Sequence, residues 1–190
     1  MNNINLLLVG VGGQGTILAS KVLAEVAMQS GLDVKMSEIH GMAQRGGSVV
    51  THVKIGSKVF SPLVEKGEAD IIMAFEQLEA LRWLDYLKPE GEVLVSRQII
   101  EPVPVILGKA KYPDNIVAEV KKVVSRVIAV DAVDIAGDCG NPKASNVVMI
   151  GMLAQKLDFS REVWIEALRK LVPPALLQIN EAAFEKGCAC

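Results

Sequence analysis

The chain has 190 residues, of which 51% are hydrophobic and 22% charged, a composition that is typical of a folded globular protein and excludes intrinsic disorder. Its 20 lysines and arginines are balanced by 22 aspartates and glutamates, and the net charge of −2 argues against broad electrostatic binding to nucleic acid. An aromatic content of 4% also leaves few rings on which single-stranded bases could stack.

The first forty residues predict a β-loop-α-β unit. Residues Ile4 to Val9 form a continuous apolar run that ends in glycines, which is typical of a strand buried on both faces of a parallel sheet. A helix is expected from Thr16 to Gln29, because its polar residues fall four apart on one stripe. A second strand is expected from Leu32 to Ile39. Crossovers of this kind are right-handed and join parallel strands.

The middle of the chain predicts a hairpin followed by further strands and helices. Residues Ser48 to Ile55 alternate between two faces, and Gly56-Ser57 is a turn signal into Lys58-Val59-Phe60, so a β-hairpin is expected there. The other expected elements are a strand at Ile71 to Phe75, a helix at Glu76 to Leu87, a turn at Pro89-Glu90-Gly91, strands at Glu92 to Ser96 and Val103 to Leu107, a helix at Asn115 to Val124 and a strand at Val127 to Asp131.

After Asp131 the pattern predicts helices alone, at Lys143 to Leu157, Ser160 to Leu171 and Ala175 to Lys186. No internal repeat or linker interrupts the chain. The predicted architecture is therefore one α/β domain over residues 1–190. Its three-layer core, over about 1–131, has a mostly parallel, mixed sheet with a glycine-rich strand-to-helix loop and one hairpin. A helical part over about 132–190 closes the core.

The cysteines and the apolar segments indicate a cytoplasmic protein. Cys139, Cys188 and Cys190 are an odd number of thiols, which is typical of a reducing compartment. No basic segment precedes the first apolar run, so no secretion signal is expected. No apolar stretch approaches the roughly 20 residues of a membrane span, so no membrane association is expected either.

A first glycine segment, Gly10-Val11-Gly12-Gly13-Gln14-Gly15, lies between the first predicted strand and the helix that opens at Thr16. In this setting a G-x-G-x-x-G pattern points to phosphate binding. Glycines let the backbone approach a phosphate closely, and the helix start offers free N–H groups and the positive end of a dipole. Glu38, at the end of the second strand, could meet a ribose hydroxyl as in dinucleotide-binding folds. The alternative is a tight turn without a ligand.

A second glycine segment, Glu38-Ile39-His40-Gly41-Met42-Ala43-Gln44-Arg45-Gly46-Gly47, lies at the carboxyl end of the second predicted strand. An arginine between flexible glycines can present its planar guanidinium to a phosphate or a carboxylate. The amide of Gln44 can both donate and accept hydrogen bonds. The alternative for Arg45 is a structural ion pair, for instance with Glu38. A dinucleotide-binding fold does not need this segment.

The two glycine segments are expected to lie side by side and to form one anion-binding pocket. Both leave the carboxyl ends of parallel strands, and open α/β sheets bind ligands at that edge. His52 is expected to be a strand residue hydrogen-bonded to a neighbour rather than a ligand. The predicted binding residues are Gly10, Gly12, Gly13, Gln14, Gly15, Thr16, Gln44, Arg45, Gly46 and Gly47.

The glycine segments occur together with several other short motifs. These are x-Val49-x-x-His52-Val53 directly after the second segment, Ser61-Pro62-Leu63, the strand from Asp70 to Glu76, and Asn180-x-x-Ala183-Phe184-x-x-Gly187. In this combination the chain resembles, over nearly its whole length, the gamma-type domain of 2-oxoacid:ferredoxin oxidoreductases. The Gly-Met-Ala-Gln-Arg-Gly-Gly form looks most like the small beta subunit of indolepyruvate ferredoxin oxidoreductases. Sister enzymes that act on pyruvate, branched 2-oxoacids or 2-oxoglutarate are close alternatives.

The resemblance implies a reaction that this chain does not carry out alone. The family oxidatively decarboxylates a 2-oxoacid to an acyl-CoA through thiamine diphosphate, iron–sulfur clusters and ferredoxin. A [4Fe–4S] cluster needs about four cysteine ligands, and the chain has three cysteines. Asp138-Cys139-Gly140-Asn141 lacks the Gly-Asp-Gly and distant Asn of a thiamine motif, and we interpret it as a helix-capping turn. Cys188-Ala189-Cys190 is expected to be an unstructured tail.

The chain is therefore expected to be a non-thiamine subunit without catalytic or metal-binding residues and without a tightly bound cofactor. The resemblance places thiamine diphosphate, Mg and iron–sulfur clusters on partner subunits. It makes ferredoxin an indirect partner and coenzyme A a co-substrate that suits the two glycine segments. The alternatives are a stand-alone NAD or flavin dehydrogenase, supported by Gly10, Gly12, Gly15 and Glu38, and a regulatory nucleotide-binding module. A mean hydropathy of +0.34 predicts an exposed apolar surface and self-association of the isolated chain.

Overall fold

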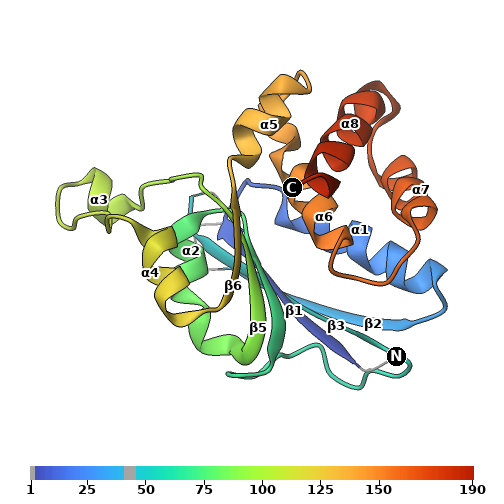
Figure 1. The fold of residues 1–190 in the computed structure, drawn as a ribbon, viewed down its shortest axis with the longest axis horizontal. Coiled ribbons are helices and arrows are strands. Elements are labelled where there is room, and N and C mark those ends of the chain that lie inside the picture. Colours follow the sequence, from blue (N-terminus) through green and yellow to red (C-terminus); the bar gives the residue numbers. More distant parts are fainter. Residues whose placement is uncertain (1–2, 41–45) are drawn as a thin grey trace.

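In the computed structural model, which describes residues 3–40 and 46–190, a six-stranded sheet lies between two layers of helices (Figure 1). The strands are β1 Ile4–Val11, β2 Asp33–His40, β3 Ser48–Gly56, β4 Ala69–Ala74, β5 Leu87–Ser96 and β6 Arg126–Val130. The helices are α1 Thr16–Gln29, α2 Gln77–Arg82, α3 Val103–Ile106, α4 Ile116–Val123, α5 Ala132–Asp138, α6 Ser145–Ala154, α7 Arg161–Leu171 and α8 Leu177–Cys188. Short 3₁₀ turns lie at Leu84–Tyr86, Pro142–Ala144 and Pro174–Leu176. The predicted three-layer α/β class is confirmed.

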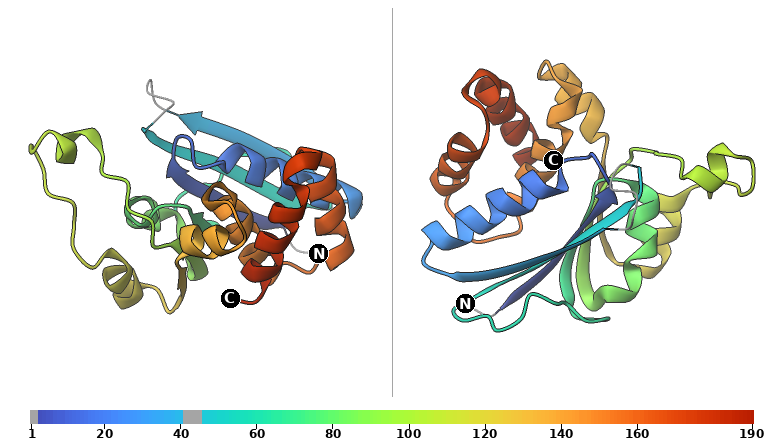
Figure 2. Two further views of the ribbon diagram at one scale, coloured as in Figure 1. Left: turned by 90° about the horizontal axis from the view of Figure 1, so that it is seen from above. Right: turned by 180° about the vertical axis from the view of Figure 1, so that it is seen from behind.

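The sheet is mixed, with the strand order β2-β3-β1-β4-β5-β6. Strands β1, β4, β5 and β6 are parallel, whereas β3 runs antiparallel to both of its neighbours, β1 and β2. The strands β1 and β2 therefore point the same way, as predicted, but β3 lies between them. Helix α1 packs on one face of the sheet and α2 on the other, as Figures 1 and 2 show. The helices that follow β1 and β4 thus lie on opposite faces of the sheet. Open α/β sheets bind ligands at the carboxyl end of such a pair of neighbouring strands.

Strand β1 contributes to two separate cores, one on each face of the sheet. Leu6 and Leu8 pack with α1, α6, α7 and α8, whereas Leu7 and Val9 pack with α2 and α4. All four side chains are fully buried. Because successive side chains of a strand point to opposite faces, a strand that is covered on both sides needs an unbroken apolar run.

The predicted hairpin into Lys58-Val59-Phe60 is wrong. Strand β3 ends at Gly56, and its two edges are already paired with β1 and β2, so the chain that follows has no free edge on which to add a strand. The backbone N–H of Val59 instead donates to the carboxylate of Asp33, at 2.9 Å. The antiparallel neighbours along the chain are β2 and β3.

Two further predictions around β5 are corrected. The segment Val103 to Leu107 is not a strand but contains the short helix α3, which follows Pro102 and has Pro104 in its first turn. Proline fits a first helical turn because its missing N–H is not needed there. The turn predicted at Pro89-Glu90-Gly91 lies inside β5, where the pairing with β4 shifts register between Leu87 and Glu92.

The C-terminal part is helical, as predicted, with two differences. Helix α5 was not predicted, although Asp138-Cys139-Gly140-Asn141 forms the expected capping turn after it. In that turn the side-chain oxygen of Asn141 accepts a hydrogen bond from the N–H of Lys143, at 3.0 Å. Cys188 was expected in an unstructured tail but is the half-buried last residue of α8. Within residues 3–40 and 46–190, no helix has the length and hydropathy needed to cross a membrane.

Candidate functional site

The two glycine segments contact each other at the carboxyl edge of the sheet. The N–H of Gly12 donates to the carbonyl of Gly47 at 2.8 Å, and the N–H of Gly46 donates to the carbonyl of Gly12 at 3.2 Å. The prediction that the segments lie side by side is therefore confirmed for Gly46 and Gly47. Gln44 and Arg45, the other two predicted residues of that segment, lie outside the described residues.

The loop before α1 needs glycine for two different reasons. Gly13 and Gly15 have φ angles of 108° and 82°, in the left-handed region that favours glycine. At Gly15, a Cβ atom would also lie 2.4 Å from the side-chain nitrogen of Asn146, on α6. Within the described residues the N–H groups of Gly15 and Thr16 have no acceptor, as expected at a helix start. The loop is thus both a tight turn and a source of free donors.

The side chain of Gln14 bridges the ends of three strands. Its Oε1 accepts from the N–H of Val11 at 2.7 Å, and its Nε2 donates to the carbonyl of Phe75 and to the side chain of Gln98, both at 2.8 Å. The space beside this bridge, among Phe75, Gln98 and the start of α6, is too small for a water molecule. Gln14 therefore has a structural role.

Replacing Gln14 by alanine is expected to lower the free energy of unfolding by about 2–3 kcal/mol, because the bridge is lost and its half-buried partners stay unpaired. Urea unfolding of the purified chain measures this difference. The matched control is Gln29→Ala, which removes one hydrogen bond to Glu25 at the exposed end of α1 and should change stability by less than about 0.5 kcal/mol. Equal losses in the two variants would contradict the bridging role.

One pocket, of about 260 Å³, lies beside the second glycine segment on the α2 side. It is bordered by Gly46, Gly47 and the buried carboxylate of Glu79. Glu79 accepts hydrogen bonds from the hydroxyl of Ser48 at 2.5 Å and from the guanidinium of Arg82 at 2.8 Å. Burial raises the pKa of Glu79 above its ordinary value. Through Ser48, this carboxylate fixes the strand end that carries the two glycines.

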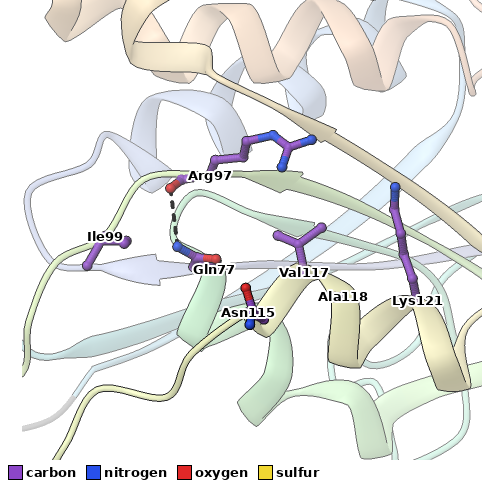
Figure 3. A pocket seen from close by; sticks show the side chains of 7 residues that line it. All are labelled: Gln77, Arg97, Ile99, Asn115, Val117, Ala118 and Lys121. Atoms are coloured by element: carbon purple, nitrogen blue, oxygen red, sulfur yellow. Dashed lines mark hydrogen bonds between the residues drawn. The ribbon is translucent and has the colours of Figure 1, made fainter.

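A second and larger pocket, of about 490 Å³, lies at the ends of β5 and α4 (Figure 3). Two cationic side chains line it, Arg97 after β5 and Lys121 on α4, and Arg97 also lies 3.6 Å from the carboxylate of Asp131. The other lining residues are Gln77, Ile99, Asn115, Val117 and Ala118. Cations, amides and apolar side chains in one open pocket suit an anionic ligand that also has an apolar part.

Sequence reasoning missed the side chains of both pockets. Glu79, Arg97 and Lys121 belong to no short motif, and Glu76 enters one only as the last residue of the segment Asp70 to Glu76, with no role predicted for its side chain. Glu76 and Glu79 are buried where helix α2 packs on the sheet. The one available signal was position, since Glu76 and Arg97 directly follow the predicted strands that end at Phe75 and Ser96. Residues at the carboxyl ends of parallel strands are the first candidates for a ligand site.

Glu38 and His52 do not take part in the site. Glu38 lies exposed on β2, and β3 separates that strand from β1 and its glycine loop, so Glu38 is not placed as a dinucleotide-binding fold requires. His52 is buried, and its Nδ1 accepts a hydrogen bond from the N–H of Val64 at 3.1 Å, which confirms the structural interpretation. Burial lowers the pKa of His52 below its ordinary value.

The fold belongs to the open α/β class, and its pockets lie at the carboxyl edge of the sheet, where proteins of this class bind ligands. The family model described as pyruvate ferredoxin/flavodoxin oxidoreductase matches residues 5–190, and the chain belongs to this family.

Individual relatives agree with this assignment. The chain is 41% identical to the indolepyruvate oxidoreductase subunit IorB of Thermococcus kodakarensis, with 98% of this chain and 95% of the relative covered. It superimposes with a TM-score of 0.72 and 25% identity on the gamma subunit of a keto/oxoacid ferredoxin oxidoreductase from Geobacter sulfurreducens, covering 97% of this chain and 95% of that one. A structure of the 2-oxoglutarate:ferredoxin oxidoreductase from Magnetococcus marinus shares the fold, with a TM-score of 0.75 and 20% identity over 100% of this chain and 31% of that one.

Proposed function

We propose that the chain is the non-thiamine subunit of a multi-subunit 2-oxoacid:ferredoxin oxidoreductase, with indolepyruvate as the 2-oxoacid. The observation that carries this proposal is the 41% identity to an indolepyruvate oxidoreductase subunit over almost the full length of both chains. The place of Glu38, two strands away from the glycine loop, speaks against the alternative of a stand-alone dinucleotide-dependent dehydrogenase. In this proposal residues 1–190 act as one domain in a cytoplasmic complex.

The proposed complex converts a 2-oxoacid and coenzyme A into an acyl-CoA and CO₂, and passes two electrons to ferredoxin. Thiamine diphosphate with Mg and the iron–sulfur clusters supply the carbon and electron chemistry on partner subunits. The task left to this chain is to bind and orient a co-substrate. Its carboxyl edge offers Arg97, Lys121 and the free N–H groups at the start of α1.

Coenzyme A is the co-substrate whose chemistry fits this edge. It carries three phosphates on a nucleotide and a long, weakly polar arm, so it needs cations at one end and an apolar path at the other. The 490 Å³ pocket provides Arg97 and Lys121 together with apolar lining from Ile99 and Val117. Arg45, which is known here from the sequence alone and directly precedes Gly46, would add a third cation at this edge of the sheet. The Magnetococcus marinus enzyme that shares this fold has coenzyme A and succinyl-CoA bound.

Replacing Arg45 by alanine is expected to raise the KM for coenzyme A in the assembled complex by about tenfold to a hundredfold, because a charge-assisted hydrogen bond to phosphate is lost. The KM for the 2-oxoacid should stay unchanged. Steady-state kinetics at varied coenzyme A measure the effect. Lys66→Ala serves as the control, since Lys66 is an exposed cation paired with Asp85, outside both pockets. Unchanged coenzyme A kinetics in the Arg45 variant would leave the segment with a purely structural role.

Affinity capture tests the proposed function itself. The tagged chain is co-expressed with a larger subunit from the same genome that carries a thiamine motif and cluster-binding cysteines. We expect a stoichiometric complex that oxidises indolepyruvate and reduces ferredoxin in the presence of coenzyme A. A chain that stays alone, or a complex that is inactive with every 2-oxoacid tested, contradicts the proposal.

A further inference from the structure

Residues Ile99–Tyr112 form an arm that projects from the body of the protein. It leaves the carboxyl end of β5, carries the short helix α3 and returns to α4, and both Figure 1 and Figure 2 show it extending away from the sheet. Four of its large apolar side chains are more than half exposed, namely Ile99 (58%), Val103 (61%), Ile106 (67%) and Leu107 (62%). Such a concentration of exposed apolar side chains on one segment marks an interaction surface.

One buried carboxylate holds the two ends of the arm together. Glu76 is 1% exposed, and its Oε1 accepts hydrogen bonds from the N–H of Ile100 at 3.2 Å and from the hydroxyl of Tyr112. Its Oε2 accepts from the N–H of Glu79, at 3.0 Å, in the first turn of α2. The arm is thereby closed at its base by a group that belongs to the core of the protein.

The arm also has internal order between these two ends. Pro102 and Pro104 restrict the backbone, and the carbonyl of Pro104 accepts from the N–H groups of Lys109 and Ala110, at 2.8 and 3.1 Å. A segment that is already ordered loses little conformational entropy when it binds a partner. The exposed side chains of Ile106 and Leu107 are therefore held on an ordered segment, in a conformation that is ready for docking.

The base of the arm borders both pockets of the candidate site. Ile100, Pro102, Val103 and Pro104 line the 260 Å³ pocket beside Gly46, and Ile99 lines the 490 Å³ pocket that contains Arg97. A macromolecule seated on the arm would thus lie next to both pockets. The partner that the proposed function requires next to this site is the subunit that carries the reacting groups.

The charged residues of the arm indicate the chemistry of the surface that it fits. Glu101 is exposed near the base, whereas Lys109 and Lys111 are exposed just after the apolar residues Ile106 and Leu107, so the arm carries a net positive charge. A complementary groove is therefore apolar in its centre and acidic where the two lysines reach it. A second copy of this chain would bring another net positive arm, which makes it a poorer electrostatic match for this surface than an acidic groove.

We propose that the arm Ile99–Tyr112 is a preformed docking element that inserts Val103, Ile106 and Leu107 into an acidic-rimmed apolar groove of the larger, thiamine-bearing subunit. Glu76 positions the arm for this contact by holding both of its ends. The proposal rests on the proposed function, because it takes its partner from there, and it adds the surface through which the two subunits meet.

The test compares the affinities of arm variants for the purified larger subunit. Ile106→Asp places a charge at an exposed position of the tip, so the chain should fold normally and unfold at the wild-type temperature. We expect its Kd for the larger subunit to rise at least about tenfold. The double variant Lys109→Glu, Lys111→Glu reverses the charge of these two positions of the arm without changing an apolar side chain. It should also weaken binding, and added salt should weaken the binding of the wild type but not that of this variant.

Phe60→Asp is the matched control. Phe60 is 85% exposed, follows the opposite end of the sheet, and receives the same chemical change, so its Kd should equal that of the wild type. If the wild-type chain binds and Ile106→Asp binds equally well, the docking proposal is wrong and the proposed function stands. If Ile106→Asp abolishes only self-association of the chain, the arm contacts a second copy and the docking proposal is again wrong. If the wild-type chain does not bind the larger subunit, both proposals fail.

Discussion

Replacing Gly187 by alanine is expected to lower the free energy of unfolding by about 3 kcal/mol, the upper part of the usual range for an overpacked core. Helices α6 and α8 cross at Gly151 and Gly187, with their backbones in direct contact. A Cβ atom on Gly187 would lie 2.0 Å from the carbonyl oxygen of Val148, and a Cβ on Gly151 would lie 2.2 Å from that of Phe184. Because the opposing atoms belong to the backbone, the two helices would have to separate.

Thermal and urea unfolding measure this effect, and a loss of about 3 kcal/mol corresponds to a melting temperature lowered by about 6–12 °C for a chain of this size. The control is Gly137→Ala on α5, where the nearest atom to a new Cβ is the Cγ of Pro142 at an ordinary 3.9 Å. That variant should be neutral or gain up to about 1 kcal/mol, because alanine favours a helix more than glycine does. Wild-type stability in Gly187→Ala would show that the helix crossing tolerates a side chain.

Gly187 illustrates what sequence reasoning can and cannot reach in this chain. The motif Asn180-x-x-Ala183-Phe184-x-x-Gly187 is recognisable in the sequence only through its family resemblance. The physical need for glycine there comes from a contact with α6, about forty residues away in the chain, and helical periodicity carries no information about such a contact. By contrast, the boundaries of α1 follow from local signals, and the structure reproduces Thr16–Gln29 without change.

In the candidate site, too, some contacts could be predicted from the sequence and others could not. The contact between Gly12 and Gly47 was predictable, because the strands β1 and β2 are parallel and both glycine segments leave the same edge of the sheet. The bridge formed by Gln14 was not, since its partners Phe75 and Gln98 lie in two later strand ends. The false hairpin after Gly56 has a related cause, because a turn signal does not reveal that both edges of β3 are already paired.

The isolated chain is expected to show no oxidation of indolepyruvate, even with thiamine diphosphate, Mg, coenzyme A and an artificial electron acceptor present. Addition of the larger subunit should produce turnover. Decarboxylation of a 2-oxoacid needs a group that stabilises the carbanion left behind, and transfer of the two electrons needs a redox centre. The helix-capping turn at Asp138–Asn141 holds no thiamine motif.

The cysteines also indicate that the isolated chain does not transfer electrons through an iron–sulfur cluster of its own. A [4Fe–4S] cluster takes about four thiolates. The chain has three cysteines, all of them free, and Cys139 follows α5 whereas Cys188 ends α8. Burial also raises the pKa of both Cys188 and Cys190, so these thiols are less available as thiolate ligands.

Acceptor reduction and release of CO₂ from carboxyl-labelled indolepyruvate are measured for the chain, for the larger subunit and for their mixture. The Phe60→Asp chain, altered only at an exposed site far from both pockets, should restore the same turnover as the wild type. Thiamine-dependent turnover by the chain alone would mean that it carries a complete catalytic centre. Turnover by the larger subunit alone, unchanged when this chain is added, would mean that the carboxyl edge with its two pockets takes no part in the reaction.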